Sequence, residues 1–230
     1  MIKKNAKLWL LNNIELFDEL NPDQKIVLQN STNEHKYAKK EFVFKTGDKM
    51  SHVYFVMQGR IKITKASDTE KEIIKRVLRS GDYFGELAAI DADNNTIFND
   101  SAVVLAKDTV VLSIPTEVFK EVIETNSSLY QEVIKNVLSN HRRLNNRLDS
   151  VMLKNSRMRI VDFIKEMAED IGKPVGYEML VKHNLTHQQI ANITGISRQK
   201  VTTILNEFKQ EGLIHLERNS ILVHDKKLLE

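Results

Sequence analysis

The chain has 230 residues, of which 41% are hydrophobic and 28% are charged, and its formal net charge is +3. This length allows two modest domains, and no apolar run approaches the roughly 18 residues that a membrane-spanning helix needs. The absence of cysteine excludes disulfides, thiol chemistry and thiolate-ligated iron–sulfur clusters. Polar residues interrupt the first apolar stretch, so we expect no signal peptide, no membrane partner and a cytoplasmic location.

The first third of the chain changes from a helical to an extended pattern. Asn21-Pro22-Asp23 predicts a helix start, because a capping side chain precedes a proline at the first helical position. From about Tyr37 to residue 114, short segments rich in Val, Ile, Phe and Tyr are separated by turns that contain Gly or Asp. The strand-like segments are 41–45, 52–59, 59–66 and 102–114. Such a series predicts an all-β sandwich or roll, after which Pro115 opens the next helix.

A long helix is predicted from about Ser127 into the 150s. Its apolar residues recur in alternating steps of four and three over three heptads, which is typical of a two-stranded coiled coil. We therefore expect a homodimer, with a helix lying on its own domain as the alternative. His141 lies in the seam, where a polar residue more often fixes the register than binds a ligand. The seam consists of Tyr130, Ile134, Val137, His141, Leu144, Leu148 and Val151.

The remaining residues predict a small domain of helices and a β-hairpin. A helix over 156–171 is ended by Gly172-Lys173-Pro174, and 178–182 suits a strand. Two further strand-like segments, 212–217 and 220–225, flank Arg218-Asn219, which is typical of a hairpin turn.

Residues 186–206 have the pattern of a helix-turn-helix. Thr186 caps the first helix with Gln189 in a capping box, and Gly195 provides the turn between the helices. Ser197 caps the second helix, whose outer face suits recognition of bases and phosphates in double-stranded DNA. The alternative is an ordinary helical hairpin with a solvated face. The predicted DNA-binding residues are Thr186, Ser197, Arg198, Gln199, Lys200, Thr202 and Thr203.

Together these motifs resemble the CRP/FNR family of bacterial transcription regulators, through segments 53–63, 81–90 and 186–214. The resemblance implies an α+β fold, with an N-terminal double-stranded β-roll (1–126), a dimerisation helix (127–154) and a C-terminal winged helix-turn-helix (155–230). It implies a homodimer on palindromic DNA, with RNA polymerase as a partner and no enzymatic activity. Arg198 matches a base-reading position of the family, whereas Gln199 and Thr203 replace the usual Glu and Arg. We therefore expect a half-site other than TGTGA.

The resemblance also locates an effector pocket at Gly85, Glu86, Leu87, Ala88, Ser101 and Ala102. In the nucleotide-binding members, the Glu of this Gly-Glu-Leu segment contacts the ribose, and an Arg-Ser pair clamps the phosphate. Here the pair is Asp100-Ser101, and the loop before it, 91–100, is longer than in the cyclic-AMP receptor protein. Because an aspartate repels a phosphate, cyclic AMP is not the expected effector.

Other modes of control stay open at this stage. Haem could reach the pocket region through His52 or His141, and a small organic effector, or none, is the more natural expectation. A cyclic-nucleotide-binding regulatory module without DNA activity is the alternative function. An enzyme ranks third among the possible functions, because the sequence contains no nucleophile–base set, metal-ligand spacing or phosphate-binding glycine loop.

Overall fold

The computed structural model describes residues 9–66, 71–91, 96–217 and 219–224. It divides into two compact units, residues 1–141 and 142–230. Parts of two predicted features fall outside the described residues: positions 92–95 of the loop before Asp100, and Arg218 and Asp225 of the C-terminal hairpin. Among the described helices, none combines the length and apolar character that crossing a bilayer requires.

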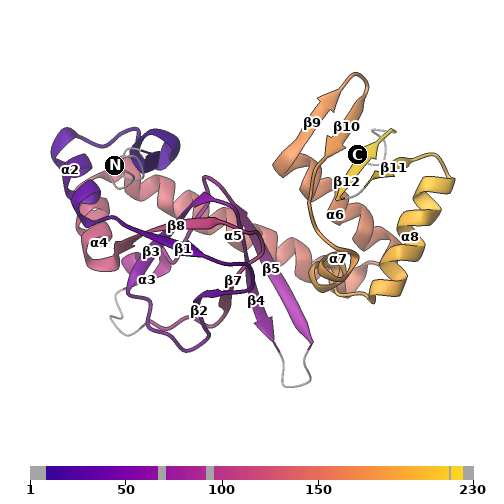
Figure 1. Ribbon diagram of the computed structural model, residues 1–230, viewed down its shortest axis with the longest axis horizontal. Coiled ribbons are helices and arrows are strands. Elements are labelled where there is room, and N and C mark those ends of the chain that lie inside the picture. The colour runs from indigo at the N-terminus through magenta and orange to yellow at the C-terminus, as the bar shows by residue number, and fades with distance from the viewer. Residues whose placement is uncertain (1–8, 67–70, 92–95, 218, 225–230) are drawn as a thin grey trace. The chain divides into compact units, whose positions relative to one another are not determined.

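The first unit is built around two four-stranded antiparallel sheets, as the β-roll prediction requires (Figure 1). Turns that contain glycine or aspartate end the strands, as predicted. Asp108, in the turn between the last two strands, has a positive φ of 53°. One sheet has the order β1 (Asn33–Tyr37), β8 (Thr109–Pro115), β3 (His52–Gln58) and β6 (Tyr83–Phe84). The other has the order β2 (Phe42–Phe44), β7 (Ser101–Val104), β4 (Arg60–Ala66) and β5 (Glu72–Arg79).

Two boundaries differ from the prediction. The roll begins at Asn33 rather than near Tyr37, because β1 is a polar edge strand whose residues are mostly exposed and give no apolar signal. Pro115 is the last residue of β8 and the N-cap of the following helix rather than its first residue.

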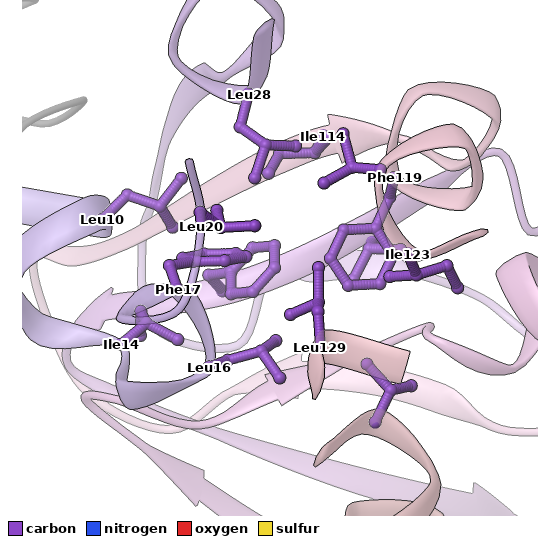
Figure 2. Close-up of a cluster of buried hydrophobic side chains, with 14 of the residues drawn as sticks. Leu10, Ile14, Leu16, Phe17, Leu20, Leu28, Ile114, Phe119, Ile123 and Leu129 are labelled. Carbon is purple, nitrogen blue, oxygen red and sulfur yellow. The ribbon is translucent and has the colours of Figure 1, made fainter. Parts of the chain in front are cut away.

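Helices cover one face of the roll and close its core. Asn21 caps α2 (Pro22–Ser31) in a complete capping box with Gln24, as its sequence predicted. Figure 2 shows side chains from the N-terminal segment, α2, β8, α4 (Thr116–Glu124) and the start of α5 (Ser127–Leu153) converging on an apolar cluster. Phe17, from η1 (Glu15–Phe17), and Phe55 are fully buried there, with ring centroids 5.3 Å apart. This burial anchors the first turns of α5 to the roll.

The second unit joins the end of α5 to a winged helix-turn-helix. The ion pairs Arg143–Asp170 and Arg147–Glu166 connect α5 to α6 (Ser156–Ile171), with N–O distances of 2.5 and 3.2 Å. Lys154, directly after α5, forms a further pair with Asp162 of α6 at 2.8 Å. Arg159 donates hydrogen bonds to the carbonyls of Val151 and Lys154 and so caps the last turn of α5. The two helices are thereby fastened along the whole of this segment.

The wing is a four-stranded sheet with the order β11 (Ile214–Glu217), β12 (Ser220–Val223), β10 (Glu178–Val181) and β9 (Gly172–Val175). The predicted hairpin is confirmed, with Asn219 at a φ of 67° in its turn. The expectation for Gly172-Lys173-Pro174 was incomplete. The helix does end at Ile171, but the segment then forms β9, an edge strand where proline is tolerated.

Candidate DNA-reading surface and effector region

The helix-turn-helix consists of α7 (His187–Thr194) and α8 (Arg198–Gln210), which lie next to each other in Figure 1. Thr186 Oγ1 accepts from the Gln189 backbone N–H at 3.2 Å, and the Gln189 side chain accepts from the Thr186 N–H at 2.9 Å. Gly195 ends α7 in the left-handed conformation with a φ of 70°. Ser197 Oγ accepts from the Lys200 N–H at 3.2 Å and starts α8. All these predictions of local structure are confirmed.

The inner face of α8 anchors it and its outer face is open. The apolar side chains that pack inward are nearly or fully buried, so the helix cannot rotate without exposing them. Arg198, Gln199, Lys200 and Thr203 are exposed, whereas Thr202 is half-buried. The buried apolar side chains are Val201, Ile204, Leu205 and Phe208 of α8 and, on the facing helix α7, Ile190, Ala191 and Ile193.

A surface groove of about 360 Å³ follows the outer face of α8. It is lined by four of the predicted residues and by Asn206, which the sequence argument missed although it lies one helical turn beyond Thr202 and Thr203. Thr202 Oγ1 and Thr203 Oγ1 each donate to the carbonyl four residues earlier, at 3.1 Å. Their hydroxyl hydrogens are therefore used within the helix.

The long helix α5 has two apolar faces. Leu129 and Val133 are at most 1% exposed and belong to the core of the first unit. The predicted seam lies on a different face: Tyr130, Leu144, Leu148 and Val151 are 40–56% exposed, His141 is exposed, and Ile134 and Val137 are half-buried. Leu138, Met152 and Leu153 add to the exposed apolar residues at 49%, 72% and 81%. Within the described residues, one face of α5 is thus covered, and most of the seam face is exposed.

In the effector region, Gly85 and Glu86 lead into a short helix, α3 (Leu87–Ile90). Gly85 has a φ of 87°, and a Cβ there would lie 2.8 Å from the carbonyl oxygen of His52. No other residue fits this close approach, so Gly85 has a structural reason to be glycine. Leu87 is half-exposed, and Ala88 is half-buried.

Glu86 faces α5 rather than solvent. Its side chain is 4% exposed, and Asn136 Nδ2 donates to its Oε1 at 3.2 Å. Burial raises the pKa of the Glu86 carboxyl, against smaller opposing effects of its own backbone N–H and of Arg76. Asn136 also hydrogen-bonds to Tyr83, whose phenol pKa is raised by burial and by the nearby Glu86. The acid that would contact a ribose is thus engaged by the chain itself.

The two positions of the phosphate clamp are engaged as well. Asp100 forms an ion pair with Lys75 of β5, with its two oxygens 2.7 and 2.9 Å from Nζ. Ser101 Oγ accepts from the Thr46 backbone N–H at 3.0 Å and lies 3.2 Å from Thr46 Oγ1. Ala102 is buried in β7. Neither Lys75 nor Thr46 was foreseen, because each is distant in sequence from its partner.

Aromatic side chains fill the interior of the roll beside this region. Phe44 stacks on Phe98 with centroids 3.4 Å apart, and Tyr54 stacks on Phe84 at 5.2 Å. Together with an aspartate at the clamp, this interior does not suit an anionic cyclic phosphate.

The two histidines considered for haem lie on separate elements. His52 is in β3, with Nδ1 2.9 Å from Ser51 Oγ, and His141 is exposed on α5. Within the described ranges, no three His, Asp or Glu side chains gather as a metal ion would require.

A roll with this topology, followed along the chain by a long helix and a winged helix-turn-helix, defines a two-part DNA-binding regulator. Comparison with known proteins agrees. Residues 34–126 match the cyclic nucleotide-binding domain family, and residues 158–230 match the Crp-like helix-turn-helix domain family.

Relatives extend this match over most of the chain. The CRP-like cAMP-activated global transcriptional regulator of Mycobacterium tuberculosis is 25% identical over 187 residues, covering 81% of this chain and 82% of that protein. The global nitrogen regulator of a Nostoc species is 23% identical, covering 82% and 83%. The structure of a CooA mutant from Carboxydothermus hydrogenoformans superposes with a TM-score of 0.77 at 22% identity, covering 96% and 93%. The chain belongs to the CRP/FNR family of DNA-binding transcription regulators, which are not enzymes.

Proposed function

We propose that this regulator acts as a homodimer on a palindromic DNA site, with one α8 in the major groove of each half-site. The observation that supports this most strongly is the first turn and a half of α8. Arg198, Gln199 and Thr203 point outward there, while the opposite face of the helix is fully buried. A rigid helix with exposed fork-shaped donors is suited to read base edges.

The chemistry of each outward residue suggests its base. Arg198 suits a bidentate contact with guanine, and Gln199 suits adenine. Thr203 has already given its hydroxyl hydrogen to Gln199, so it offers a methyl group and an acceptor, which favours contact with the methyl group of thymine. Lys200, Thr186 and Ser197 lie at helix starts and suit phosphates. The half-site should therefore differ from TGTGA.

The exposed face of α5 supports the dimer. Its large apolar side chains repeat with heptad spacing, and a second copy of the same helix would cover them. Two α8 helices can then bind half-sites one DNA turn apart. RNA polymerase is the proposed partner of the DNA-bound dimer.

Control of this regulator, we propose, does not use a cyclic nucleotide. The relative in Mycobacterium tuberculosis is described as cAMP-activated, but here Glu86, Asp100 and Ser101 all have partners within the chain. A small effector of different chemistry, or none, fits these residues better.

Selection from a randomised duplex pool at fixed salt tests the proposal, with light scattering to measure the mass of the free protein. We expect a dimer and an enriched palindrome with half-site centres about 10 base pairs apart, unchanged by cyclic AMP. No enrichment would remove the DNA-reading proposal. TGTGA half-sites, or a requirement for cyclic AMP, would remove the corresponding part.

A further inference from the structure

A hydrogen bond joins the two helices of the reading element through side chains. His187 is the first residue of α7, and its Nδ1 lies 2.8 Å from Thr202 Oγ1 on α8, 15 residues away in sequence. His187 and Thr202 are both half-buried. Buried apolar side chains of the two helices, such as Ile190 and Leu205, hold α8 down but do not orient its outer side chains.

The hydrogen atoms of this bond can be assigned. Thr202 has one hydroxyl hydrogen, which it donates to the carbonyl of Arg198 at 3.1 Å. If that hydrogen goes to the carbonyl, which can only accept, Thr202 Oγ1 is left to accept from His187, and we infer on this basis that Nδ1 carries the proton. The result is a relay of two hydrogen bonds from the imidazole, through the hydroxyl, to the backbone of Arg198.

Packing alone does not fix the imidazole. A cavity of about 230 Å³ lies beside it, lined among others by His187, Leu205 and Ile221. A side chain beside such a pocket has fewer close neighbours on that side, so the hydrogen bond to Thr202 contributes to fixing the His187 rotamer. The capping box of Thr186 meanwhile fixes the backbone from which His187 projects.

We propose that His187 is a positioning residue, which holds Thr202 and the first turn of α8 in the orientation that reads bases. This inference rests on the proposed DNA-reading function. The hydroxyl of Thr202, one of the predicted DNA-binding residues, is instead hydrogen-bonded within the protein. Losing the bond lets the first turn of α8 sample other orientations, which reduces discrimination between sequences more than affinity for DNA in general.

Two pairs of matched variants test this role. In His187→Asn the amide nitrogen can occupy the place of Nδ1, whereas in His187→Gln it reaches only the place of Nε2. Thr202→Ser keeps the hydroxyl, and Thr202→Val removes it at nearly constant shape. The measurement is the ratio of affinities for the selected palindrome and a scrambled duplex at fixed salt, with thermal melting to confirm folding.

We expect His187→Asn and Thr202→Ser to keep the wild-type ratio. His187→Gln, Thr202→Val and the double variant should each lower it by a similar factor, about 3- to 10-fold. Equal behaviour of the Asn and Gln variants, additive losses in the double variant, or an equal loss on both duplexes would overturn the inference. A wild-type protein that fails to discriminate would instead remove the proposed function.

A measurement without DNA distinguishes failure of the His187 inference from failure of the proposed function. Nitrogen NMR of the free protein should show the His187 ring protonated at Nδ1, and Thr202→Val should shift the backbone amides of Arg198 and Gln199. A neutral ring protonated only at Nε2 in the wild-type protein would overturn the inference even if DNA reading stands.

Discussion

The two units of this chain use their polar side chains in opposite ways. In the winged helix, Thr186 and Ser197 satisfy helix ends, and the long polar side chains beyond them stay exposed. In the roll, Glu86, Asp100 and Ser101 stand where a ligand would be contacted, yet each is engaged from within the chain. The winged helix therefore exposes polar side chains that could contact a partner, whereas the polar side chains of the roll contact other residues of the same chain.

This difference indicates that the fold shared by a family does not determine which ligand a member binds. Gly85 is required by its backbone conformation and by the His52 carbonyl, whatever the roll binds. The Gly-Glu-Leu segment can thus persist for structural reasons alone. Ligand specificity depends on the few side chains that contact the ligand, not on the shared fold.

The largest expected effect comes from placing a charge in the exposed apolar seam of α5. Leu148→Glu places a charge in the seam, and because Leu148 is 56% exposed the single chain should still fold. Loss of the dimer removes simultaneous binding to two half-sites and should weaken affinity by about 10²- to 10⁴-fold. Light scattering and DNA titration measure this.

Ser139→Glu is the matched control, since Ser139 is exposed on the other side of α5. It should remain dimeric. A dimeric, fully active Leu148→Glu protein would show that the dimer forms elsewhere.

Next in size is the removal of one base-reading side chain. Arg198→Ala should cost about 1–3 kcal/mol on the selected site, because a bidentate contact with guanine is lost, and should relax specificity at one base pair. Lys200→Ala should instead weaken all duplexes similarly and lower the salt slope by about one. Titrations at several salt concentrations distinguish the two; identical profiles would contradict the assigned roles.

For the roll, the sharpest test uses pH. Burial raises the pKa of Glu86 above its ordinary value of 4.5, so the native state binds more protons than the unfolded chain at pH values just above 4.5. The free energy of unfolding should therefore fall as pH rises from 4.5 through the raised pKa. Glu86→Gln, which cannot ionise, should lack this decline, so the difference between variant and wild type grows as pH rises.

Urea unfolding over a pH series provides the measurement, with Glu124→Gln, an exposed acid, as the control. Parallel curves for Glu86→Gln and wild type would show that Glu86 is not held in an unfavourable environment.

The smallest effect is expected at the position that corresponds to the family's phosphate clamp. Asp100→Asn removes an ion pair whose side chains are 33% and 21% exposed, so the loss of stability should be about 0–1 kcal/mol. Urea unfolding measures it, with Glu117→Gln as a surface control. A loss above about 2 kcal/mol would mean that the pair is a main support of the fold rather than only occupying the site.

The sequence predicted best the features that depend on near neighbours. The caps at Thr186 and Ser197, the left-handed Gly195 and the hairpin turn at Asn219 all follow from residues a few positions apart. Strand β1 was missed because it is a polar edge, and β9 because its proline argued against a strand.

Side-chain contacts between residues distant in sequence could not be predicted. Asp100 and Lys75 are 25 residues apart, Glu86 and Asn136 are 50 apart, and Ser101 and Thr46 are 55 apart. Which of these meet is decided by sheet register and helix docking, and no local pattern encodes that. The sequence therefore showed that the phosphate clamp had changed but not what replaced it.

The capped end of α5 has a consequence for transplanting the DNA reader into other proteins. Arg159 holds the carbonyls of the last turn, and a Cβ on Gly195 would lie 3.6 Å from Val151 Cγ2 and 3.8 Å from Arg159 Nη1. The terminal turns of α5 are thus a structural part of the reader. A chimera joined after Lys154 would discard them, whereas one joined near Arg142 would keep them together with the rest of the second unit.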